Sequence, residues 1–198
     1  MIANPQSLTP AEYLVWEAAQ PLKYEYIDGK VYAMTGGNPP HNGIALNCYS
    51  QLRTHLRERG CRVNVADVKV QVAPEGSYFY PDLVVSCDER DRQALEAIAY
   101  PCLIVEVLSP STASFDRGEK FKFYRRLPTL REYVLIEADK VGVDCYRKNS
   151  AGKWELTAYP EEAPATQEPI LEFVSLDFRC PLMVLYQDVA LTQGGQPL

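Results

Sequence analysis

Long apolar runs are missing from this sequence. No stretch approaches the roughly 20 consecutive apolar residues that a membrane-spanning helix requires. The N-terminal segment MIANPQSLTP also lacks the basic start and apolar core of a signal peptide. We therefore expect a cytoplasmic protein that makes no contact with a membrane.

Closely spaced metal-binding cysteines and histidines are missing as well. The six cysteines include no Cys-x-x-Cys pair, and only two histidines are available to join them. A zinc site of the usual spacing is therefore not expected. Several cysteines stand inside apolar runs, among them Cys102 and Cys145, so the sequence predicts reduced thiols buried in a core.

The sequence has no excess of basic residues. It contains 26 acidic residues and 20 lysines and arginines, which gives a formal net charge of −6. Nucleic acids attract lysine and arginine and are repelled by an acidic surface. The charge therefore weakens the case for DNA as a substrate, although a local basic patch or bound divalent metals would offset it.

The composition is that of an ordinary globular protein. Of the 198 residues, 46% are hydrophobic and 23% are charged. This length favours one domain over two. We expect a single domain over 1–198, with its core at about 21–188 and a loose tail at 192–198.

Helix and hairpin signals dominate the first third of the chain. Thr9, Pro10 and Glu12 predict a capped helix that runs to about Ala19. Two β-prone runs around Asp28-Gly29 predict a hairpin over 24–34. Apolar residues recur every four positions from 41 to 59, which indicates an amphipathic helix that Gly60 ends.

The remaining segments are rich in strand signals. We expect strands at 61–72 (with an irregularity at Ala66-Asp67), 80–85, 102–108, 133–136, 141–147 and 154–159. Helices are expected at 88–97, at 111–126 and, in a short form, at 181–188, and an exposed loop at 161–168. This order predicts an α/β or α+β fold with a mixed sheet flanked by helices.

Glu106 is the most informative residue because it is the one charge in the apolar segment 102–108. Burial of a lone carboxylate costs several kcal/mol, so Glu106 needs a cation, a proton or several hydrogen-bond donors. A functional site is one explanation. A structural pairing with a core arginine, or a loop cap, is the other.

Asp82 follows Pro81 at the head of another β-prone run. Taken alone, it is an ordinary solvent-exposed residue at a strand end. If its strand neighbours that of Glu106, the two carboxylates converge and need a hard cation such as Mg²⁺ or Mn²⁺ between them. A water on that metal would be acidic enough to attack a phosphodiester.

Lys120 is the candidate third member of this site. With Asp116 and Tyr124 it follows the spacing i, i+4, i+8 on one helix face. Lys120 could reach over the strand end, orient the attacking water and stabilise the charged transition state. A surface ion pair between Asp116 and Lys120 is the simpler alternative.

The Pro81-Asp82 and Glu106 segments resemble the proline-aspartate and glutamate-x-lysine signature of the PD-(D/E)XK nuclease superfamily. More closely, the chain resembles the bacterial Uma family of proposed restriction endonucleases. The resemblance runs from Tyr24 to about Arg147 and includes 24–29, His41, 81–85, 105–112, Asp116, Lys120, Tyr124 and 132–134. It implies a restriction-endonuclease-like mixed sheet with flanking helices and active-site residues at strand ends.

One position departs from the superfamily pattern. The usual lysine would stand two residues after Glu106, where this chain has Leu108. The resemblance implies that the lysine has moved to the following helix, which points to Lys120. Residue 108 would share a strand face with Glu106, so replacement from a nearby helix is geometrically reasonable.

The resemblance also raises Glu25 and His41 as candidates. Related nucleases often have an extra N-terminal acid that touches a metal, and Glu25 would be that ligand. His41, at a helix start, would contact a phosphate. The alternatives are a solvent-facing strand residue for Glu25 and a plain cap residue for His41.

The resemblance implies an endonuclease that hydrolyses DNA with Mg²⁺ or Mn²⁺, with a homodimer as the form that cuts both strands. A catalytically weak or inactive binding or structural module on the same fold is the main alternative, favoured by the acidic charge and by Leu108. Hydrolysis of another phosphoester is a third.

Overall fold

The computed structural model describes residues 7–34, 36–73, 76–159, 168–193 and 196–197. A six-stranded mixed sheet forms its centre, with β8 and β9 parallel and the other neighbours antiparallel. In spatial order its strands are β11 (Trp154–Tyr159), β10 (Val143–Lys148), β9 (Glu132–Glu137), β8 (Leu103–Leu108), β6 (Leu83–Ser86) and β3 (Arg62–Val65).

A second, five-stranded sheet is built from shorter strands. In spatial order these are β2 (Lys30–Ala33), β1 (Tyr24–Ile27), β5 (Tyr78–Phe79), β4 (Lys69–Gln71) and β7 (Ala97–Ile98). The two sheets and their helices confirm the predicted α/β class with a mixed sheet flanked by helices.

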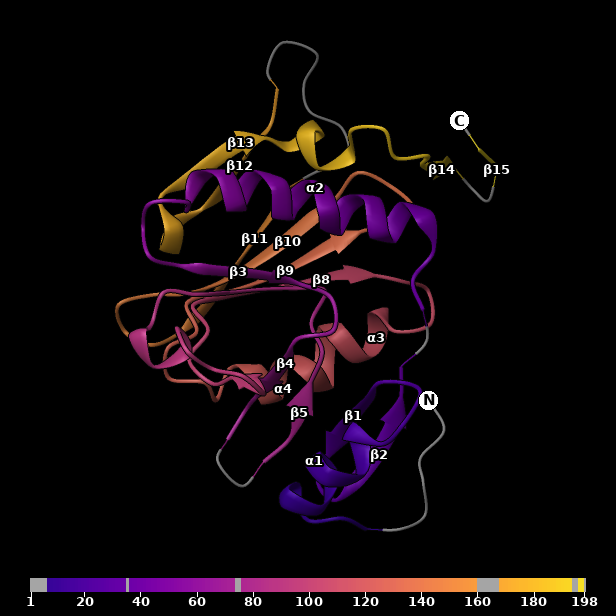
Figure 1. Ribbon diagram of the computed structural model, residues 1–198. Coiled ribbons are helices and arrows are strands. Elements are labelled where there is room, and N and C mark those ends of the chain that lie inside the picture. The colour runs from indigo at the N-terminus through magenta and orange to yellow at the C-terminus, as the bar shows by residue number, and fades with distance from the viewer. Residues whose placement is uncertain (1–6, 35, 74–75, 160–167, 194–195, 198) are drawn as a thin grey trace.

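Each face of the six-stranded sheet is covered by different elements. On one face lie helix α2 (Pro39–His55) and the hairpin β12 (Ile170–Phe173) and β13 (Phe178–Pro181). On the other lie α3 (Ala113–Phe115) and α4 (Phe121–Tyr124), with α1 (Pro10–Ala18), β1 and β2 on the same side (Figure 1). All six residues of β8 are buried, so it is the predicted central strand.

The N-terminal predictions are confirmed except for the end of the second helix, which was expected at about Arg59 and lies at His55. Thr9 and Glu12 form a capping box at the start of α1. Asp28 and Gly29 take positive φ angles of 46° and 90°, as a two-residue hairpin turn between β1 and β2 requires. The predicted helix from residue 41 starts at Pro39, because the Asn38 side chain accepts from the His41 amide and caps it.

The irregularity at Ala66-Asp67 is a change of sheet. Both residues have left-handed φ angles, 46° and 50°. The chain leaves β3 in the large sheet there and enters β4 in the small one. The amide of Ala66 donates to the carbonyl oxygen of Asp82 at 3.1 Å, so this turn also fixes the backbone just before β6.

The predicted helix at 88–97 is wrong. Only a 3₁₀ turn, Glu89–Asp91, forms there. Asp88 accepts from the amide of Arg90 and so caps this turn. The buried Asp91 carboxylate bonds three groups outside any helix: Ser86 Oγ and the amides of Ala99 and Tyr100. These side-chain bonds compete with helical ones and end the helix early.

Three other predictions concern the C-terminal part. The expected helix at 181–188 is a 3₁₀ helix, Leu182–Tyr186, and the hairpin β12–β13 was not predicted. Most of the expected loop at 161–168 lies outside the described residues. Within the expected loose tail, β14 (Thr192–Gln193) pairs with β15 (Gln196–Pro197).

The cysteines differ in part from the expectation. Cys48, Cys145 and Cys180 are buried thiols, as predicted. Cys61 and Cys87 form a disulfide, because they stand at the next register position beyond the Arg62–Ser86 pair of β3 and β6. Within the described residues, no helix is both long and apolar enough to cross a membrane.

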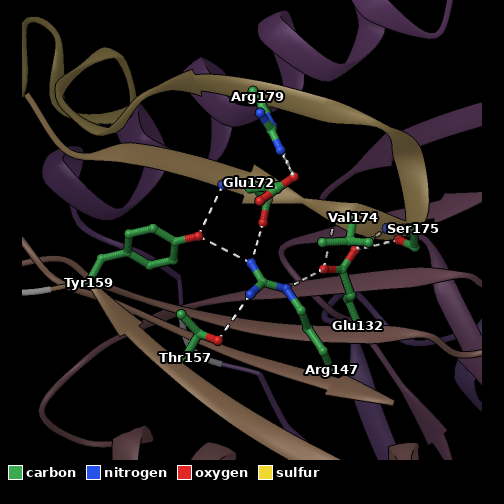
Figure 2. A network of polar contacts seen from close by, with 8 residues as sticks. All are labelled: Glu132, Arg147, Thr157, Tyr159, Glu172, Val174, Ser175 and Arg179. Atoms are coloured by element: carbon green, nitrogen blue, oxygen red, sulfur yellow. Dashed lines mark hydrogen bonds and ion pairs between the residues drawn. The ribbon is translucent and has the colours of Figure 1, made fainter. Parts of the chain in front are cut away.

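A buried ion pair joins the β12–β13 hairpin to the large sheet (Figure 2). Glu132 on β9 is 1% exposed and binds the guanidinium of Arg147 on β10 with a 2.9 Å contact. The Glu132 carboxylate also accepts from the amides of Val174 and Ser175, and Arg147 donates to Tyr159 and to the carbonyl of Glu172. The pair therefore connects the neighbouring strands β9 and β10 with Tyr159 on β11 and with residues 172–175 of the β12–β13 hairpin.

We predict that Arg147→Met lowers the free energy of unfolding by about 3 kcal/mol, because it leaves the Glu132 carboxylate buried without its cation. Urea denaturation followed by circular dichroism measures this. Arg179→Met is the control, since the Arg179–Glu172 pair lies largely in solvent and its loss should hardly move the midpoint. Equal effects of the two substitutions would contradict the assigned role of Arg147.

Candidate active site

Asp82, directly before β6, lies beside Glu106 on the neighbouring strand β8. Leu83 pairs with Val105, so the next register position places Asp82 opposite Glu106. Side chains at opposite positions share a sheet face, with Cβ atoms about 5 Å apart. Ile104, two residues before Glu106, belongs to the core cluster that contains α4, so both carboxylates lie on the α3–α4 side of the sheet.

Lys120 reaches this face from the helical segment after β8. It ends a π-helical turn, Asp116–Lys120, between α3 and α4. Its Nζ lies 2.9 Å from Glu106 Oε1, 3.0 Å from Glu25 Oε1 and 3.6 Å from Asp116 Oδ1. Lys120 is 6% exposed and Asp116 3%, so the pair is a buried contact and not the surface ion pair that was the simpler alternative.

Glu25 enters from the second sheet. It is 5% exposed, and its Oε1 accepts from the amide of Tyr80 at 3.3 Å. Tyr124 completes the group from α4, where its hydroxyl donates to Glu106 Oε1 at 3.1 Å. The structure therefore brings together five of the residues singled out in the sequence: Glu25, Glu106, Asp116, Lys120 and Tyr124.

Asp82 is held next to this group by other partners. Its Oδ2 accepts from the amide of Val107 at 2.7 Å and lies 3.2 Å from His41 Nε2. His41 stands in the first turn of α2. Burial works against a charged imidazole, but the hydrogen bond and charge of Asp82 outweigh it and raise the pKa of His41.

Burial and charge oppose each other across the cluster. Burial raises the pKa of Glu106 well above its ordinary value, and Lys120 offsets only part of this. Burial also raises the pKa of Asp116. For Lys120, burial disfavours the charged form, yet Glu106 and Glu25 outweigh it and raise its pKa well above the ordinary value. Lys120 is therefore the cation on which the buried acids depend.

The donor chemistry of this cluster suits a hard divalent cation. Carboxylate oxygens are the ligands that Mg²⁺ and Mn²⁺ prefer, and several converge here. However, among the described residues no three histidine, cysteine, aspartate or glutamate side chains are placed to share one metal ion. The ammonium of Lys120 lies between the carboxylates of Glu25 and Glu106 instead.

Arg117 anchors the π-helical turn and was not singled out in the sequence. Its Nη2 lies 2.5 Å from Glu137 Oε1 at the end of β9, and its Nη1 binds Asp144 on β10. Tyr133 on β9 also holds this turn, because its hydroxyl donates to the carbonyl oxygen of Asp116 at 3.0 Å. The partners of Arg117 lie 20 and 27 residues away, so local spacing gives no signal for these contacts.

The family is settled by comparison over most of the chain. Residues 10–179 match the model of the Uma2 family, which is described as "Putative restriction endonuclease". The chain belongs to the Uma2 family. The predicted resemblance to Uma proteins is thereby confirmed.

Two similar proteins come from Synechocystis sp., and both are described as uncharacterised. The first, slr1290, is 40% identical over 183 residues, which cover 92% of this chain and 93% of the relative. The second, sll1609, is 37% identical over 160 residues, or 79% of this chain and 90% of the relative.

A solved structure from Anabaena variabilis, titled a putative nuclease belonging to DUF820, shares the fold. Its TM-score is 0.72 with 17% sequence identity, and the match covers 91% of this chain and 98% of the other. At this identity the likeness shows the nuclease-like fold alone.

We predict that Arg117→Met lowers the free energy of unfolding by about 1 kcal/mol, since it removes a partly exposed double ion pair that anchors the π-helical turn. Lys122→Met on the next turn is the control, because its ion pair with Glu119 lies in solvent. Urea denaturation of both variants measures the difference. A loss for Lys122→Met as large as that for Arg117→Met would contradict the anchoring role.

Proposed function

We propose that this Uma2 protein is an endonuclease that hydrolyses DNA phosphodiester bonds with the help of Mg²⁺ or Mn²⁺. The observation that carries the proposal is the buried Lys120 ammonium, held by Glu25 and Glu106 beside Asp82. A buried cation among converging carboxylates is costly to maintain, and such clusters concentrate at functional sites. The Uma2 membership and the nuclease-like fold support the same activity.

Asp82, Glu106 and Glu25 would be the residues that hold the metal. When bound, a divalent ion supplies an acidified water and offsets charge on the phosphate. Asp82 is the most accessible of the three, with 23% of its side chain exposed against 4% for Glu106 and 6% for Glu25. We therefore place the phosphate on the Asp82 side of the cluster.

The other residues of the cluster have distinct proposed roles. The Lys120 ammonium would orient the attacking water and stabilise negative charge that develops on the phosphate. Asp116 and Tyr124, which contact Lys120 and Glu106, would position those two groups. His41 has a raised pKa and stands in the first turn of α2, so it would donate to a phosphate oxygen.

A homodimer would place two such sites on opposite strands of a duplex, and a cytoplasmic location would give access to DNA. The alternative is a binding module of the same fold without catalysis. That alternative is favoured by Leu108, which stands where the superfamily's usual lysine would fall, and by the formal net charge of −6.

We predict that the protein nicks supercoiled plasmid DNA only when Mg²⁺ or Mn²⁺ is present. Lys120→Met should reduce nicking about 100-fold or more, because it removes the group that stabilises the transition-state charge. Lys122→Met, two residues away and exposed, should keep the wild-type rate. Agarose gel electrophoresis with EDTA controls measures both. Undiminished nicking by Lys120→Met would remove Lys120 from the mechanism, and no nicking by wild type would favour the binding module.

A further inference from the structure

We infer that Cys61, Cys87 and Cys102 form a thiol–disulfide exchange site at the end of β6. Cys87 is the shared sulfur of this site. It forms a disulfide with Cys61 or with Cys102, and it accepts low-molecular-weight thiols of the glutathione type. This chemistry is separate from the hydrolysis of DNA, and the inference does not rest on the proposed function.

Three neighbouring strands bring these cysteines together. β6 lies between β3 and β8 in the large sheet. Cys61 directly precedes β3, Cys87 directly follows β6, and Cys102 directly precedes β8. Because β6 runs antiparallel to both neighbours, all three residues fall at the same edge of the sheet. Strand pairing therefore places Cys87 between two possible partners.

Cys87 already contacts both partners. It is joined to Cys61 by a disulfide, and the Sγ of the free Cys102 lies 3.9 Å from the Sγ of Cys87. A disulfide bond is about 2 Å long, so the two sulfurs need to approach by only about 2 Å. The amide of Cys102 donates to the carbonyl oxygen of Val85 at 2.8 Å, which holds the backbone of Cys102 beside β6. Exchange therefore requires side-chain movement and no change of strand pairing.

Chain entropy does not select one pairing over the other. The Cys61–Cys87 bond joins residues 26 positions apart, and a Cys87–Cys102 bond would join residues 15 positions apart. The entropy of loop closure changes only slowly with loop length. The two disulfides are therefore close in this part of their stability, and exchange can run in both directions.

Exposure makes Cys87 the sulfur that outside thiols reach. Cys87 is exposed, whereas Cys61 and Cys102 are partly buried. The other free cysteines are buried: Cys48, Cys145 and Cys180. Access decides which sulfur of a disulfide a thiolate attacks, and exposed disulfides are the labile ones. A low-molecular-weight thiol therefore attacks Cys87 and forms a mixed disulfide there.

Each exchange step balances without an outside oxidant. In the direct step the Cys102 thiolate attacks Cys87 Sγ, a Cys87–Cys102 bond forms and the Cys61–Cys87 bond breaks. Cys61 leaves as the thiolate and takes up the proton that Cys102 lost. In the route through a mixed disulfide, an outside thiolate first displaces Cys61 from Cys87, and Cys102 then displaces the outside thiolate. The number of disulfide bonds stays the same in both routes.

The protonation of Cys102 sets the rate of exchange. Burial raises the pKa of Cys102 to about 11, backbone hydrogen bonds offset only part of this, and the Glu132 carboxylate on β9 raises it further. The thiolate is the attacking form, so below this pKa the rate should rise about ten-fold for each pH unit.

Peptide mapping of the full-length wild-type protein tests the exchange directly. Cleavage after lysine and arginine places the three cysteines in separate peptides, 60–62, 70–90 and 93–117. The protein is oxidised with glutathione disulfide, freed from the excess, held at mildly alkaline pH, blocked with N-ethylmaleimide and digested. We expect two cross-linked pairs, Cys61–Cys87 and Cys87–Cys102, in wild type and in the control Cys180→Ser. Cys102→Ser should give the first pair alone, and a wild type that also gives the first pair alone would overturn the inference.

A second measurement follows Cys61→Ser treated with glutathione disulfide. Glutathione should first attach to Cys87, and Cys102 should then displace it, so that peptide mapping finds a Cys87–Cys102 disulfide. Cys61→Ser/Cys102→Ser should keep the glutathione adduct on Cys87. A persistent adduct in Cys61→Ser, or a Cys87 that never reacts, would contradict the exchange site.

Discussion

The arrangement of this protein's candidate site depends on one interaction, the contact of a buried lysine ammonium with carboxylates from separate parts of the chain. Lys120 meets Glu106 from the central strand, Glu25 from the N-terminal hairpin and Asp116 from its own helix. Each of these acids would be unstable where it lies without a cation. The contact therefore ties the second sheet and the helical segment to the large sheet at one point.

The rest of the fold presents this contact from rigid elements. β8 is buried on both faces, with α2 on one side and the α3–α4 segment on the other. Arg117 and Tyr133 fix the π-helical turn to β9 and β10, and Ala66 fixes the backbone of Asp82. A buried ion pair, Glu132–Arg147, holds the β12–β13 hairpin in place. Side chains held in this way have little freedom to relax when one partner is removed.

The sequence predicts those parts of the architecture that depend only on residues close together in the chain. The capping box of α1, the Asp28-Gly29 turn and the apolar strand around Glu106 each depend on neighbouring residues. The fold class follows from their order. The prediction of a helix at 88–97 was wrong because Asp91 bonds groups up to nine residues away. The Cys61–Cys87 disulfide depends on the register of β3 and β6, which cannot be read from the sequence alone. Arg117 was missed for the same reason.

In the candidate site, too, features set by neighbouring residues could be predicted, and features set by long-range contacts could not. Asp116, Lys120 and Tyr124 follow one helical face, and Glu106 is marked by its apolar neighbours, so their proximity could be anticipated. Their mutual charge balance could not, because it depends on how far Lys120 extends and on Glu25 arriving from another sheet. The catalytic and metal-binding roles of these residues stay predictions.

The most direct test of the central claim is nitrogen-15 NMR of the lysine side chains near neutral pH, with Lys120→Met to assign the signal. If Lys120 is a buried ammonium bonded to carboxylates, its NH₃⁺ group should give a resonance protected from exchange with water, unlike that of exposed Lys122. A neutral amine at Lys120, or an ammonium that exchanges as fast as the exposed lysines, would contradict the account.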